Sequence, residues 1–127
     1  MNCRIIAIDN FRKEAKWLLK KFPSLKEELI ALEQQLLQNP RFGIEITINT
    51  YKIRLAVKSK GKGKSGGMRV ISHVIELDMQ VEEQDFDVTV FLLSIYDKSE
   101  EANISEKELK ALIEDARQVL DNDDNDK

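Results

Sequence analysis

The sequence predicts an α+β fold: an antiparallel sheet of about four strands, with an N-terminal helical hairpin packed on one face and a C-terminal helix. The observations behind this class are changes of hydrophobic period. Apolar residues recur at helical spacing over residues 11–36, switch to a period of two from residue 43, and return to helical spacing after residue 105. A length of 127 residues suits one core. We therefore expect a single domain over residues 1–120.

The N-terminal third predicts a strand followed by two helices. Residues 4–8 are rich in β-branched side chains and end at the Asp9-Asn10 breaker, which indicates a short strand. The first helix should end at Pro23, and the second should begin with a capping box made by Ser24 and Glu27. Only about two residues separate the helices, so an antiparallel hairpin is expected. Their apolar stripes are Phe11, Ala15, Leu18, Leu19 and Phe22, then Leu25, Leu29, Leu32 and Leu36.

The middle of the chain predicts the sheet. Between residues 43 and 58, apolar residues alternate with polar ones, so one face should pack on the helices while the other presents cations. Residues 68–77 and 86–95 are nearly continuous apolar runs, typical of central strands buried on both faces. An acidic turn at residues 78–85 should join them. The alternating apolar residues are Ile44, Ile46 and Ile48, then Tyr51, Ile53, Leu55 and Val57.

The last helix should begin at a second capping box, formed by Ser105 and Glu108. Its apolar stripe is Leu109, Leu112, Ile113, Ala116 and Leu120. The run of Asp and Asn beyond it, residues 121–127, is too polar to bury and is predicted to be a disordered acidic tail.

Composition excludes several classes of protein. No apolar run is long enough for a membrane span, and the apolar patch in residues 1–9 is too short for a signal peptide, so we expect a cytoplasmic protein without membrane contact. Cys3 is the only cysteine and His73 the only histidine. Histidine triads and multi-histidine or multi-cysteine metal centres are therefore impossible, and no metal or small-molecule cofactor is expected. His73 is interpreted as a core histidine with a hydrogen-bond partner.

The net charge of −3 conceals a strong segregation of charges. The tail holds four aspartates against one lysine, which accounts for the whole net charge. Residues 52–69 carry no acid, and their composition fits equally well a phosphate-binding surface or an edge strand that lysines protect from aggregation. The cations in this segment are Lys52, Arg54, Lys58, Lys60, Lys62, Lys64 and Arg69.

The glycine-rich loop at residues 59–67 is expected to be flexible and to connect two strands. Gly63-Lys64-Ser65 resembles the end of a P-loop. That motif needs a glycine where Lys58 stands and a helix after the serine, whereas a strand is expected here. A nucleotide triphosphatase is therefore rejected.

Three segments, taken with the order of elements, resemble the RelE/HigB branch of the RelE/ParE toxin superfamily over about residues 4–115. The first is Tyr51-Lys52-Ile53-Arg54-Leu55, and the second runs from Gly63 through Arg69 to Ile71. The third is Leu93-Ser94-Ile95-Tyr96-Asp97-Lys98-Ser99-Glu100, followed by Asn103-Ile104-Ser105. No single segment would suffice, but the combination is fairly specific.

The resemblance implies a RelE-like fold and the toxin of a type II toxin–antitoxin system. Such a toxin is a metal-independent endoribonuclease that enters translating ribosomes and cuts messenger RNA, with the 2′-hydroxyl as internal nucleophile, until a cognate antitoxin binds it. The implied partners are thus an antitoxin protein, the ribosome and mRNA. Two other readings stay open: a ParE-like inhibitor of DNA gyrase, and a catalytically silent protein that only binds its antitoxin.

Matched position by position, the resemblance implies catalytic roles for Lys52, Arg54, Arg69 and Lys98. Arg69 matches the arginine that holds the scissile phosphate, and Lys52 is our hypothesis for the general base. Many relatives place a tyrosine late in the C-terminal segment, which this chain lacks. Tyr96 or Tyr51 is the substitute, although both also suit sheet packing. The loop lysines, expected to bind RNA phosphates without reading bases, are Lys58, Lys60, Lys62 and Lys64.

Overall fold

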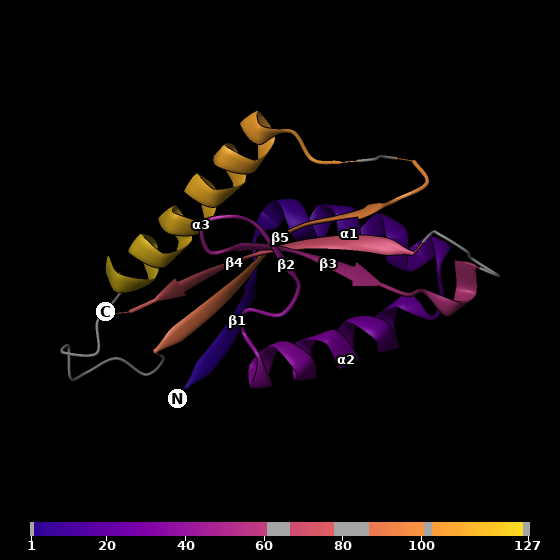
Figure 1. The fold of residues 1–127 in the computed structure, drawn as a ribbon, viewed down its shortest axis with the longest axis horizontal. Helices are drawn as coiled ribbons and strands as arrows, with labels where there is room; N and C mark the ends of the chain where they lie inside the picture. The colour runs from indigo at the N-terminus through magenta and orange to yellow at the C-terminus, as the bar shows by residue number, and fades with distance from the viewer. Residues whose placement is uncertain (1, 61–66, 78–86, 101–102, 126–127) are drawn as a thin grey trace.

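A computed structural model describes residues 2–60, 67–77, 87–100 and 103–125 (Figure 1). Its elements alternate much as the hydrophobic periods indicate. In chain order they are β1 (Cys3–Ala7), α1 (Asp9–Lys21), α2 (Leu25–Gln38), β2 (Ile44–Thr47), β3 (Thr50–Leu55), the 3-10 turn η1 (Lys58–Lys60), β4 (Met68–Glu76), β5 (Val88–Asp97) and α3 (Glu106–Asn125).

The strands form one five-stranded sheet in the order β1-β5-β4-β3-β2. Strands β2 to β5 pair antiparallel with their chain neighbours, which confirms the α+β class and the antiparallel meander. The fifth strand, β1, pairs parallel to β5 at the opposite edge. Periodicity predicts that β1 exists but carries no information on its partner, which lies 85 residues further along the chain.

Helices cover both faces of the sheet. Figure 1 shows α2 and α3 on opposite sides of the strands, while α1 contacts β5 and α2 contacts β1. The expected stripes are buried at Phe11 and Ala15 of α1, and β4 and β5 are buried along nearly their whole length, as predicted. The stripes of the other two helices are buried at Leu25, Leu32 and Leu36, and at Leu109, Ala116 and Leu120. Within the described residues, no helix has the length and apolarity needed to cross a membrane.

Side chains of α1 complete the hydrogen bonding of β5 where β1 ends. Pairing with β1 stops at Leu92, and the register between β4 and β5 shifts just beyond it, so Leu93 is an extra residue. Asn10 Nδ2 donates to the carbonyl oxygen of Leu93 at 3.0 Å, and the backbone N–H of Ile95 donates to Glu14 Oε1 at 3.1 Å. Because buried backbone groups must be paired, these contacts fix the end of β5 that leads to the candidate site.

The hairpin of β2 and β3 departs from the expected pattern. The face of β3 that carries Tyr51 and Ile53 is buried, as predicted, but Ile44, Ile46 and Ile48 are 68%, 38% and 77% exposed. The reason is that β2 is an edge strand with an irregular register, and all four of its residues are exposed. The prediction that its isoleucines pack on the helices was wrong.

Two helix ends also differ from expectation. The capping box at Ser24 is absent: its backbone is already helical, and its hydroxyl donates instead to Glu28 Oε1 at 3.0 Å. Ser105 does cap α3: the Glu108 N–H donates to Ser105 Oγ at 3.1 Å, and the Ser105 hydroxyl donates to Glu108 Oε1 at 3.2 Å. Finally, α3 continues to Asn125, so residues 121–125 are helical where a disordered tail was predicted. Acidic residues do not prevent a helix from extending once it is nucleated.

Candidate functional site

The sheet brings five predicted site residues to one face. Arg54 of β3 pairs with Arg69 of β4, which in turn pairs with Tyr96 of β5, and directly paired residues share a face. Lys52 lies two residues before Arg54 and therefore on the same face. Lys98 follows two residues after Tyr96, and its backbone N–H donates to the carbonyl oxygen of Gly67 at 3.3 Å. We call these five residues the basic face.

Burial differs sharply across the basic face. Arg54 is exposed and Lys52 and Lys98 are half-buried, whereas Tyr96 and Arg69 are only 5% and 8% exposed. One guanidinium nitrogen of Arg69, Nη1, donates to the carbonyl oxygen of Met68 at 3.2 Å. The arginine that resemblance assigns to the phosphate is thus held within the sheet, and Arg54 is the cation most open to a ligand.

The linker between β5 and α3 lies against this face. Lys52 Nζ donates to Asn103 Oδ1 at 2.9 Å. Asn103 therefore orients the ammonium of Lys52, which is a positioning contact that the sequence pattern did not reveal.

Lys60, predicted to bind RNA from a flexible loop, is instead half of a buried ion pair. Its ammonium contacts the Asp97 carboxylate, and the two side chains are 11% and 5% exposed. Asp97 also accepts hydrogen bonds from the backbone N–H and the hydroxyl of Ser99, at 2.9 and 2.8 Å. Burial alone would raise the pKa of Asp97, but the hydrogen bonds from Lys60 and Ser99 outweigh it and lower that pKa.

Gly67 closes the same corner of the site. Its φ of 67° lies in the left-handed region, and a Cβ there would stand 2.6 Å from the carbonyl oxygen of Leu55. Only glycine fits such a close approach. Gly67 therefore lies directly before β4 and beside the Lys60–Asp97 pair. Its close contact with Leu55 fixes the register of β3 and β4, in which Arg69 lies opposite Arg54.

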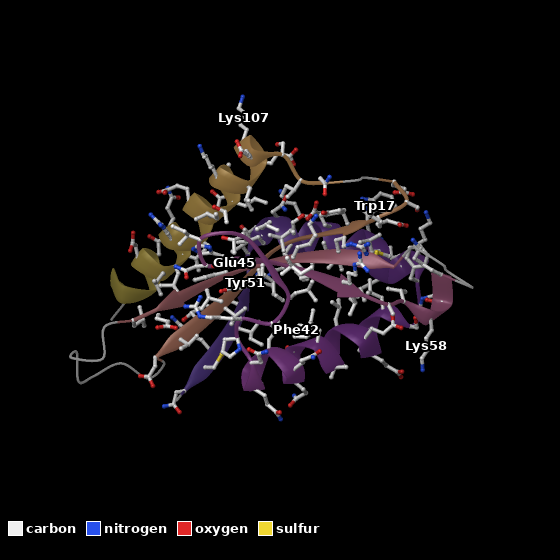
Figure 2. All side chains as sticks on the ribbon, viewed as in Figure 1. Trp17, Phe42, Glu45, Tyr51, Lys58 and Lys107 are labelled. Carbon is white, nitrogen blue, oxygen red and sulfur yellow. The ribbon has the colours of Figure 1, made fainter. Side chains whose placement is uncertain are left out.

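The remaining loop lysines do not join the basic face in the described structure. Lys58 is exposed and its backbone N–H donates to Glu28 Oε2 of α2 at 2.8 Å; Figure 2 shows its side chain pointing away from the body near α2. Lys62 and Lys64 lie outside the described residues, as does the acidic turn at residues 78–85.

His73 is a core residue, as predicted. It is 4% exposed, and its Nδ1 lies 2.8 Å from Thr50 Oγ1. The Thr50 hydroxyl donates its own proton to the Ile48 carbonyl oxygen, so Nδ1 of His73 must carry the hydrogen of the shared bond. Burial, followed by the nearby charge of Arg117, lowers the pKa of His73 from its ordinary value of 6.5. This buried, neutral histidine lies on the same face of the sheet as Arg69, four residues further along β4, where it stabilises the sheet.

The arrangement offers cations, hydroxyls and amides rather than a metal site. Among residues 2–60, 67–77, 87–100 and 103–125, no group of three or more His, Cys, Asp or Glu side chains could hold a metal ion. A cluster of arginine and lysine beside a tyrosine can bind a phosphodiester and stabilise the extra negative charge that develops when it is cleaved.

The chain was compared with protein-family models and with solved structures. No protein-family model matches the chain. Among solved structures, the free state of a mutant of the Escherichia coli toxin RelE, with two arginines replaced by alanine, is similar over 90% of this chain and 97% of that one, with a TM-score of 0.52 and 19% sequence identity. The chain therefore has the fold of the RelE toxin, as the resemblance implied.

Proposed function

We propose that this chain is the toxin of a type II toxin–antitoxin system, a metal-independent endoribonuclease that cuts messenger RNA on the ribosome and therefore acts in the cytoplasm. The observation that carries the proposal is the gathering of Lys52, Arg54, Arg69, Tyr96 and Lys98 on one face of a RelE-like sheet. Fold alone does not define function. The chemical reason for proposing a nuclease is that the cations on this face can bind and stabilise a phosphodiester.

Cleavage through the 2′-hydroxyl of the RNA needs no protein nucleophile. The 2′-oxygen attacks the adjacent phosphorus, the bond to the 5′-oxygen breaks, and a proton must leave the first oxygen and reach the second. The protein has only to align these atoms, move the proton and stabilise the phosphorane. A site without an exposed histidine can perform each of these tasks.

The geometry suggests how the tasks are divided. Arg54 is exposed and would meet the phosphate first, while Arg69 beside it is held by the sheet and adds preorganised positive charge. We assign Lys52, whose ammonium donates to Asn103 Oδ1, as the group that takes the proton of the 2′-hydroxyl. We assign Lys98, on the other side of Arg69, to the leaving oxygen. Tyr96 is 5% exposed, so it supports the site from within the sheet and does not hold a base.

An antitoxin is the expected protein partner. A segment that covers the basic face would need complementary negative charge, and it would silence the enzyme by excluding RNA from the same cations.

The first test is a translation reaction with purified ribosomes and a defined messenger, with cuts mapped by primer extension. Wild type should cut within translated codons, and Arg54→Ala, an exposed change with little effect on folding, should lower the cleavage rate by about 10²–10³-fold. Arg69→Ala should lower the cleavage rate at least as much. Because Arg69 is buried, a thermal melt of this variant and the cleavage rate of Arg69→Lys separate a loss of chemistry from a loss of stability.

Lys107→Ala is the matched control, because Lys107 is exposed on α3 and points away from the body (Figure 2). Intact messenger with folded wild type would overturn the nuclease proposal, and inhibition of gyrase supercoiling by the same protein would replace it with a ParE-like activity.

A further inference from the structure

Helix α1 exposes a tryptophan in the middle of a basic surface. Lys13, Lys16, Trp17 and Lys20 are spaced at i, i+3, i+4 and i+7, so they share one face of the helix. Trp17 is 77% exposed, and Figure 2 shows it at the surface of the molecule. Tryptophan gains more from burial than almost any other side chain, so its exposure among lysines suggests a ligand.

Two hollows meet at Trp17. One, of about 410 Å³, is lined by Lys13, Lys16, Trp17 and Lys20. The other, of about 200 Å³, is lined by Trp17 and Leu18, by Ile95, Tyr96 and Asp97 of β5, and by the carboxylates of Glu14 and Glu100. Two of its three carboxylates are paired with lysines, Asp97 with Lys60 and Glu100 with Lys21. Trp17 therefore lies between the basic surface of α1 and the Tyr96 end of the basic face, and a ligand that extends past Tyr96 would reach it.

The chemistry of this surface fits a single nucleic-acid strand. A flat exposed indole can stack on an unpaired base, and ammonium groups around it can neutralise the flanking phosphates. In the described structure no apolar side chain besides Trp17 lines the hollow of about 410 Å³, so its own lining suits a charged strand better than a protein. A neighbouring hollow of about 490 Å³ on α1 is lined mainly by apolar residues, which include Phe11, Ala15 and Leu19, and would suit a protein partner better. The exposed isoleucines of β2 are another surface that would suit such a partner.

We propose that this α1 surface holds a single-stranded RNA segment that continues from the basic face. One base stacks on Trp17, and Lys13, Lys16 and Lys20 bind the phosphates beside it. The identity of the ligand as RNA rests on the proposed function, whereas the stacking site rests on the geometry of α1.

Because Trp17 is the only tryptophan, its fluorescence reports directly on this site. The probe is a single-stranded 2′-O-methyl RNA of ~12 nucleotides, which cannot be cleaved through its 2′-oxygens. Titration into the full-length protein should quench Trp17, and a labelled strand followed by anisotropy should bind Trp17→Ala about five- to 150-fold more weakly. Trp17→Phe keeps a ring and should retain most of the affinity.

The phosphate contacts have their own readout. Lys16→Ala should reduce the slope of log affinity against log salt by about 0.7. Lys107→Ala, on α3, should leave both affinity and slope unchanged. A duplex of the same sequence should bind more weakly and quench less, since its bases are not free to stack.

Several results would overturn the proposal. These are no binding, binding without a change in Trp17 fluorescence, equal affinity for wild type and Trp17→Ala, or equal quenching by the duplex. Quenching by a cognate antitoxin but not by RNA would reassign the surface to a protein. The probe is not cleaved, so the two proposals fail separately: binding without messenger cleavage rejects the nuclease alone, and cleavage with normal binding by Trp17→Ala rejects the stacking site alone.

Discussion

Lys60 and Asp97 are two opposite charges that are almost completely removed from water. Replacing Asp97 with Asn would leave the Lys60 ammonium buried without a counter-charge, and we expect the free energy of unfolding in urea to fall by about 3 kcal/mol. The pair of Lys21 and Glu100, which are 61% and 65% exposed, provides a matched comparison. Glu100→Gln should change the unfolding free energy by less than about 1 kcal/mol. Equal effects of the two substitutions would contradict the assignment of a buried pair.

The Lys60–Asp97 pair also makes the free energy of unfolding depend on pH. The pKa of Asp97 is lower in the folded protein than its ordinary value of 3.8. Its stabilising contribution is therefore complete above that value and is lost as pH falls below it, through the folded pKa. Asp97→Asn should remove this component of acid unfolding.

His73 gives a second pH effect, at milder acidity. Its pKa is lowered in the folded state, so the unfolded chain binds the proton more readily and stability decreases as pH falls below about 6.5. The slope can reach at most about 1.4 kcal/mol per pH unit. Urea unfolding of wild type and His73→Gln at pH 7.5, 6 and 5 tests this, because the chain has no other histidine. A wild-type stability that is flat across this range, or a mutant with the same slope, would exclude His73 as the cause.

Helix α1 acts as a substitute for the missing strand beside the end of β5. Glu14 Oε1 accepts hydrogen bonds from Asn10 Nδ2, from Ser94 Oγ and from the N–H of buried Ile95, at 3.0, 2.8 and 3.1 Å. Glu14→Ala leaves these donors without their acceptor, and we expect it to lower the unfolding free energy by about 2–4 kcal/mol. Glu14→Gln keeps an acceptor oxygen and should cost less.

Glu33, which is exposed on α2, is the control for Glu14. Glu33→Ala should remain within about 0.5 kcal/mol of wild type in the same urea experiment. If Glu14→Ala is equally mild, α1 does not hold the end of β5.

Periodicity predicted the helices and strands well, because burial of one face forces an apolar residue into each helical turn or every second strand position. It failed where that force is absent. Ile44 and Ile48 alternate like core residues, but β2 lies at an edge beyond the reach of the helices. Ser24 has the residues of a capping box, yet its hydroxyl finds other partners, Glu28 and Ser59.

The candidate site was predicted only in part for a similar reason. Residue type and resemblance identified the cations, and strand register then brought Arg54, Arg69 and Tyr96 into one row. Sequence alone could not show that Lys60 pairs with Asp97, because their contact spans the loop and two strands. Trp17 is a further case: the signal in the sequence is a lone tryptophan at a polar position of the helix between Lys16 and Lys20, and only the structure shows that it is exposed.

Across the protein as a whole, charge is segregated rather than balanced. Net charge is −3, yet cations are concentrated on one face of the sheet and on one face of α1, while four aspartates follow residue 120 in the sequence. Net charge therefore says little about affinity for phosphates. The electrostatic potential that a ligand meets therefore depends on the side of the protein from which it approaches.

The pairing of β1 with β5 also sets the order in which the protein is completed during its own synthesis. Strand β1 must wait for β5, because about two thirds of the 127 residues lie between Cys3 and its partner Val88. At roughly 5–20 residues per second, a nascent chain spends several seconds with β1 unpaired. Tyr96 and Lys98 emerge at the end of the same final strand, so the basic face cannot assemble before the sheet does. A growing chain of this RelE-like fold thus carries its candidate chemistry only after β5 has been synthesised and paired with β1.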